Sequence, residues 1–116
     1  MTPHEQIRLV LGELAGGRVF PGIADAGTPT PYVTFQVIGG PPINFITGEV
    51  PAKRFMRVQI NVWSDTSIEA FEVVEQVENA FHAEKVLQME VLTNPSDTYD
   101  ELTEHRGAMQ EFQLFL

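Results

Sequence analysis

Several things are missing from this sequence, and each absence excludes a class of protein. There is no cysteine, so disulfide bonds and thiolate chemistry are excluded. No apolar run approaches the roughly 18 residues that a membrane-spanning helix needs, and the first residues lack the basic and apolar regions of a signal peptide. Basic residues are scarce, because 7 Lys and Arg stand against 16 Asp and Glu and give a net charge of −9. We therefore expect no membrane contact and no sequence-specific binding of nucleic acid, which would need a basic surface.

The usual patterns of enzymes and cofactor proteins are also missing. There is no glycine-rich phosphate-binding motif, and His4, His82 and His105 lie far apart without metal-ligand spacing. Four polar residues of a predicted helix lie opposite its apolar stripe and predict a solvated face: Glu69, Glu72, Glu75 and Gln76. We therefore expect no catalytic residue, no cofactor site and no metal site, and we do not expect an enzyme.

The stretch from Lys53 to Phe81 is the best-patterned part of the chain. Its first half alternates as a strand with one buried face does, with one side formed by Met56, Val58, Ile60 and Val62. The opposite side carries Arg57, Gln59, Asn61 and Trp63. Its second half has the three- and four-residue spacing of an amphipathic helix, formed by Ala70, Phe71, Val74, Val77 and Phe81. Thr66 and Glu69 have the spacing of a capping box, so a strand should run directly into a capped helix.

The remaining segments complete a small α+β pattern. Thr2 and Pro3 begin a predicted helix over residues 3–15. Strands are predicted over residues 32–38, 86–92 and 109–116, with an extended acidic segment over residues 97–104 and a turn at residues 105–107. One apolar face per element predicts a two-layer α+β sandwich, with a mostly antiparallel sheet of three to four strands and two helices on one face. A chain of 116 residues should form a single domain, residues 1–116.

The segment of residues 39–52 does not fit this regular pattern. Its 14 residues join two strands where a hairpin needs about two to five. It carries four apolar side chains for which no core position is apparent: Ile43, Phe45, Ile46 and Val50. The segment either folds back over its own sheet or forms an interaction arm that docks on a neighbouring copy, and we favour the arm. Arg57 and Trp63, on the outer face of the next strand, are further interface candidates.

Several motifs, taken in order, resemble a known family. The run R-V-Q-I-N-V-W-S-D-T-S-I-E-A is similar to the central segment of bacteriophage tail-completion, or tail-terminator, proteins. The earlier L-A-G-G-R-V-F-P and T-P-T-P-Y-V-T-F-Q-V-I, the late Asp97-Thr98-Tyr99-Asp100 and the closing E-F-Q-L-F-L extend the likeness over nearly the whole chain. Two departures are the G-G-P-P-I-N-F-I segment and Asn61, where Asp is more usual.

The resemblance implies a structural protein of a tailed phage or prophage. Such a protein closes the head-proximal end of the tail and joins it to the head, as a homo-oligomeric, typically hexameric, ring around the DNA path. Its implied partners are further copies of itself, tail-tube proteins and head-completion proteins, with assembly in the bacterial cytoplasm and a final place in the virion tail. An acidic lumen would let DNA pass without capture, and candidates to face it are Asp97, Asp100, Glu101 and Glu104.

Two other classes remain open. A small ligand-binding or regulatory α+β domain would have a similar order of elements, although the sequence shows no cluster of polar residues for a pocket. An enzyme with scattered carboxylates is the third class.

Overall fold

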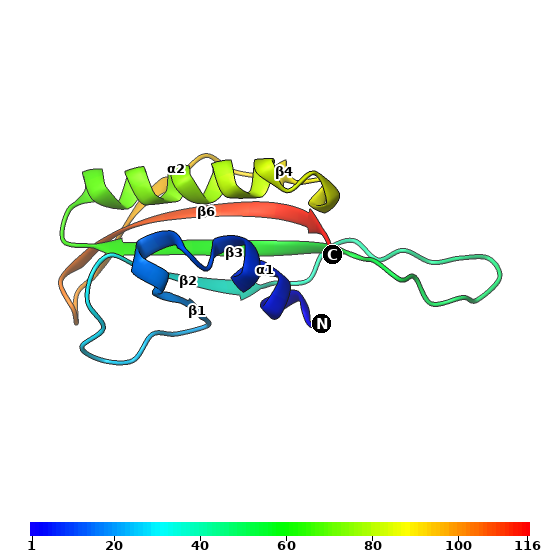
Figure 1. The fold of residues 1–116 in the computed structure, drawn as a ribbon, viewed down its shortest axis with the longest axis horizontal. Coiled ribbons are helices and arrows are strands. Elements are labelled where there is room, and N and C mark those ends of the chain that lie inside the picture. Colours follow the sequence, from blue (N-terminus) through cyan, green and yellow to red (C-terminus); the bar gives the residue numbers. More distant parts are fainter.

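A computed structural model describes residues 1–116 and shows two helices packed on one six-stranded sheet (Figure 1). The helices are α1 (Pro3–Leu11) and α2 (Ser67–Ala83). The strands are β1 (Val19–Pro21), β2 (Tyr32–Val37), β3 (Phe55–Ser64), β4 (Glu90–Val91), β5 (Ser96–Asp100) and β6 (His105–Phe115). The α+β class predicted from the sequence is confirmed.

The sheet differs from the prediction in size and direction. Its strands follow the order β1-β2-β3-β6-β4, with β5 also paired to β6. The pair β1 and β2 is parallel, whereas the other pairs are antiparallel, so the sheet is mixed. The expectation of three to four strands in a mostly antiparallel sheet is therefore wrong in the number of strands, and it did not include the parallel pair. The missed strand β1 has three residues, too few to show a period-two pattern, and β4 keeps only two residues of the strand predicted over residues 86–92.

The predicted strand over residues 86–92 is largely wrong as well. Residues Lys85–Leu87 form a 3-10 turn, and only Glu90–Val91 pair with β6. The turn expected at residues 105–107 is instead the beginning of β6, since His105 pairs with Asp100. The reversal of the chain lies earlier, over residues 101–104, where the amide of Glu104 donates to the carbonyl of Asp100.

The first helix is shorter than predicted. It ends at Leu11, and a separate 3-10 turn follows over Leu14–Gly17, in which Ala15 and Gly16 have positive φ angles. Its start is as expected, because Thr2 and Glu5 form a complete capping box and Pro3 occupies the first turn.

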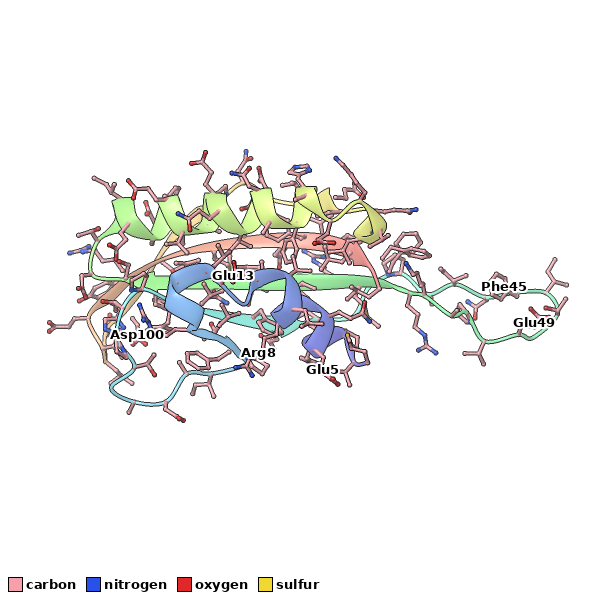
Figure 2. All side chains as sticks on the ribbon, in the orientation of Figure 1. Glu5, Arg8, Glu13, Phe45, Glu49 and Asp100 are labelled. Atoms are coloured by element: carbon pink, nitrogen blue, oxygen red, sulfur yellow. The ribbon has the colours of Figure 1, made fainter.

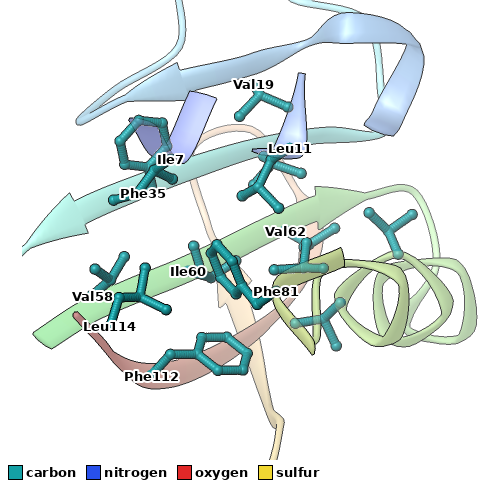
Figure 3. Packing of buried hydrophobic residues seen from close by; sticks show 14 of the residues in the cluster. Ile7, Leu11, Val19, Phe35, Val58, Ile60, Val62, Phe81, Phe112 and Leu114 are labelled. Carbon is teal, nitrogen blue, oxygen red and sulfur yellow. The ribbon is translucent and has the colours of Figure 1, made fainter. Parts of the chain in front are cut away.

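One hydrophobic core lies between the sheet and the two helices (Figure 3). The strand residues predicted to face inward do so, and Val58, Ile60 and Val62 are fully buried in β3. They pack beneath α2, which buries Ala70, Val73, Val74, Val77 and Phe81. Phe71 was assigned to this stripe but is only half-buried, and Val73 takes its place. The same core includes Ile7 and Leu11 of α1, so both helices cover one face of the sheet.

Candidate functional site

The connection between β2 and β3 forms an arm that projects from the end of the sheet (Figure 1). We define the arm as residues 39–54. At its base the amide of Arg57 donates to the Gly39 carbonyl at 2.5 Å, and the amide of Arg54 donates to the Leu116 carbonyl at 2.7 Å. At its tip the amide of Gly48 donates to the Phe45 carbonyl at 3.0 Å. The base is therefore tied to both β3 and the C-terminal strand.

Between base and tip the two legs of the arm are not paired to each other. Backbone hydrogen bonds between the legs are absent from Pro41 to Ala52, and a space of about 490 Å³ separates them. Pro41, Pro42 and Pro51 lack the N–H group that a ladder needs, which explains why this connection is not a regular hairpin. The arm therefore has free backbone groups as well as free side chains.

The apolar residues of the arm lie apart from the core. Ile46 is fully exposed, Val50 is 76% exposed and Phe45 is 49% exposed, whereas Ile43 is half-buried. Figure 2 shows Phe45 and Glu49 far from the body of the molecule. The arm does not fold back over its own sheet, so these side chains are available to another molecule.

The structure does not bring Arg57 and Trp63 to the arm's tip. Both lie on the face of the sheet that no helix covers, at opposite ends of β3. Arg57 is close to the arm but already forms an ion pair with Glu111. Trp63 is half-buried and pairs in register with Tyr32 and Gly107 at the far end.

The acidic candidates gather at that far end of the sheet. Asp97 and Asp100 lie on β5, and Glu101 and Glu104 lie in the turn that leads to β6. Asp100 is labelled in Figure 2 at the end opposite the arm. Its carboxylate accepts from the amide of Leu102 at 2.9 Å, which orders the turn.

Two groups have shifted pKa values, and neither belongs to a catalytic arrangement. Burial raises the pKa of the Tyr32 hydroxyl, and the charge of Asp100 adds to the rise. This hydroxyl lies 3.1 Å from Nδ1 of His105 and links β2 to β6. Hydrogen bonds from Thr2 lower the pKa of Glu5, as expected for the carboxylate of a helix cap.

The carboxylates and imidazoles of the chain do not gather into a metal-binding cluster. No group of three or more His, Asp or Glu side chains is placed to hold a metal ion. Neither helix is both long enough and apolar enough to cross a bilayer.

One surface was missed from the sequence: a groove between α2 and the segment that enters β5. It has a volume of about 710 Å³ and is lined by Glu72, Glu75 and Glu78 of α2 and by Asp97 of β5. The three-residue spacing of the glutamates was a visible signal, but it predicted only a solvated helix face. That Asp97 lies across from them depends on how β5 pairs with β6.

In fold, the chain is a two-layer α+β protein similar to a chain in the virion of a native gene transfer agent particle. The two share 13% sequence identity with a TM-score of 0.51, over 94% of this chain and 82% of that one. No curated protein matches the sequence.

The sequence also matches a family model described as tail completion protein gp17, over residues 4–116. The chain therefore belongs to the tail completion protein gp17 family, which confirms the resemblance drawn from its motifs. It is a phage tail structural protein, and its place is the virion tail.

Proposed function

We propose that this protein forms a ring at the head-proximal end of a phage or prophage tail, where it terminates the tail and joins it to the head. The ring is proposed to be a homohexamer assembled in the bacterial cytoplasm, with tail-tube and head-completion proteins as its neighbours. Six copies of a 13.0 kDa chain give an assembly of about 78 kDa. Family membership supports this role over that of a ligand-binding or regulatory domain.

The observation that carries the proposal is the exposed apolar arm. A monomer gains nothing from holding Ile46 and Val50 in water, because burying each side chain is worth roughly 1.5–3 kcal/mol. A ring needs a contact in which one patch meets a different patch on the next copy. The arm projects from one end of the molecule and is suited to one side of such a contact. Arg57 and Trp63 are proposed as additional contacts on the uncovered sheet face.

The acidic end of the molecule is proposed to face the DNA path. Asp100, Glu101 and Glu104 lie together at the end of β5 and in its following turn, whereas Asp97 lies further back on β5, beside α2. Their charge repels the phosphate backbone, so DNA would pass without being held.

The proposal is tested by the double substitution of Phe45→Asp with Ile46→Asp. Both side chains are exposed and outside the core, so the variant should keep the circular dichroism spectrum of the folded wild type. Assembly should be lost, and light scattering should show a monomer of 13.0 kDa in place of a ring of about 78 kDa.

A matched control is Leu9→Asp with Ile23→Asp. These residues are also exposed, at 71% and 85%, and the same charge is added away from the arm. The control should assemble as the wild type does. Loss of folded structure in the arm variant, or assembly that survives it, would contradict the proposal.

A further inference from the structure

The groove beside α2 is lined by four carboxylates and by no basic side chain. Glu72, Glu75 and Glu78 follow one side of the helix at three-residue spacing, and Asp97 lies across from them. Ile68 and Phe71 form an apolar border at the N-terminal end of α2, with Ile68 75% exposed. Such a surface matches a cationic polypeptide segment that also carries apolar side chains.

A buried side chain in this groove points to the same kind of ligand. Gln110 lines the groove and is 1% exposed. Its Nε2 donates to Oε1 of Glu78 at 2.8 Å and to the Thr93 carbonyl at 3.0 Å. Because the nitrogen faces two acceptors, the orientation of the amide is settled, and Oε1 has no hydrogen-bond partner. An acceptor left alone in this way is unfavourable, and what it lacks is a donor.

The arm carries the matching charge. Residues 39–54 contain one acidic residue, Glu49, and two basic ones, Lys53 and Arg54, for a net charge of +1, whereas the rest of the chain has 15 acidic and 5 basic residues, for a net charge of −10. Neither Lys53 nor Arg54 forms an ion pair, since Arg57 with Glu111 is the single ion pair of the structure. The arm is therefore a basic segment with apolar side chains on a strongly acidic molecule.

The arm and the groove of one molecule cannot meet. The ten residues of β3 run from the arm to the start of α2, a distance of roughly 33 Å, and the arm points away from the sheet (Figure 1). Asp100, in the strand that also supplies Asp97, lies at the end opposite the arm in Figure 2. A groove beside the sheet and an arm that points away from the sheet describe a head-to-tail contact between copies.

We propose that the groove between α2 and β5 receives the arm of a second copy. Arg54 and Lys53 enter between the carboxylates, where a guanidinium can donate to several oxygens at once. Val50, which is 76% exposed, then covers Ile68 and Phe71. From Ile68 to Glu78 the helix is about 15 Å long, and from Val50 to Arg54 the arm can span about 13 Å, so Val50 reaches the apolar border when Arg54 lies beside Glu78. This inference rests on the proposed role of the arm in assembly and adds the surface that receives it.

Exchange of charge between the two surfaces tests the contact. The groove variant Glu72→Lys with Glu75→Lys and the arm variant Lys53→Glu with Arg54→Glu should each fail to assemble. Mixed at equal amounts they should assemble again, because each arm then meets a groove of opposite charge, and the mixture should contain both chains in a 1:1 ratio. As a control, Glu101→Lys with Glu104→Lys makes the same charge change outside the groove and should assemble alone. A groove variant that assembles alone, or a mixture that does not recover, would overturn the inference.

A peptide experiment separates this inference from the proposed function. The probe is a fluorescent peptide of residues 39–54, added to the full-length Phe45→Asp, Ile46→Asp protein, whose groove is intact. Its binding, followed by anisotropy, should weaken at least about tenfold with the groove substitutions, and it should weaken as salt is raised. It should not change with Glu101→Lys and Glu104→Lys. If the peptide binds but the wild type is a monomer, the proposed ring is rejected and the groove remains the binding site of the arm. If the wild type forms a ring but peptide binding does not depend on the groove residues, only the proposed arm-to-groove contact is rejected.

Discussion

Gly107 shows how one residue shapes the uncovered face of the sheet. It lies in register between Trp63 of β3 and Thr98 of β5. A β-carbon built on Gly107 would overlap Oγ1 of Thr98 and lie 2.8 Å from Cε3 of Trp63. The glycine is required here because it leaves room for the indole, so Trp63 is held half-buried by its own strand neighbours. This local packing explains the position of Trp63 without any contact to another molecule. The role of Trp63 as a contact between subunits stays a prediction.

We expect Gly107→Ala to lower the free energy of unfolding by about 1–3 kcal/mol, because the added methyl group overpacks the row. Urea unfolding followed by Trp63 fluorescence measures the change. The double variant with Thr98→Ala should recover part of the loss, since it removes one of the colliding atoms. Equal stability of Gly107→Ala and wild type would show that Trp63, Gly107 and Thr98 are packed less tightly than the structure indicates.

At the scale of elements, α2 illustrates a partly correct prediction. Oγ1 of Thr66 accepts from the amide of Glu69 at 3.2 Å, as the sequence spacing predicted. The carboxylate of Glu69 does not return to the backbone of Thr66 and instead accepts from the hydroxyl of buried Ser64. The helix start is thereby tied to the end of β3, which a capping box would not do.

We expect Thr66→Ala to lower the free energy of unfolding by about 1 kcal/mol, the usual value of an N-cap side chain. Thr47→Ala in the exposed arm is the control and should stay within about 0.5 kcal/mol of wild type. Both substitutions are made in the monomeric Phe45→Asp, Ile46→Asp protein, and thermal or urea unfolding measures the two changes in the free energy of unfolding. A loss of stability in Thr47→Ala as large as that in Thr66→Ala would contradict the assignment of Thr66 as the N-cap of α2.

At the scale of the whole molecule, the arm sets the shape. The chain measures 51 × 24 × 24 Å and has a radius of gyration of 14.9 Å. A compact protein of this length has a radius of gyration of about 13.4 Å. The excess follows from the arm, which extends beyond the core without covering it (Figure 1).

Replacing residues 41–51 by two glycines should therefore reduce the radius of gyration to about 13 Å. Small-angle X-ray scattering measures this, with the Phe45→Asp, Ile46→Asp protein as the monomeric reference. The arm buries no core residue, so the unfolding free energy should change little. A large loss of stability would mean that the arm supports the fold.

The strand and helix of residues 53–81 were predictable because their periods are set by local geometry. Side chains alternate along a strand and return every three to four residues on a helix, so Val58, Ile60 and Val77 had to face the core. The short strands could not be predicted this way. Val19–Pro21 and Glu90–Val91 become strands only because β2 and β6 offer free edges to them.

The sequence by itself determined the α+β class, the family, the main strand and helix, and the unusual residues 39–52. These rest on periodicity, charge and motif order, which are properties of neighbouring residues. Only the tertiary structure decided that residues 39–52 project as an arm and that Asp97 faces the glutamates of α2 across a groove. Both depend on which strands pair at the sheet edges, a choice made by contacts between residues distant in the chain.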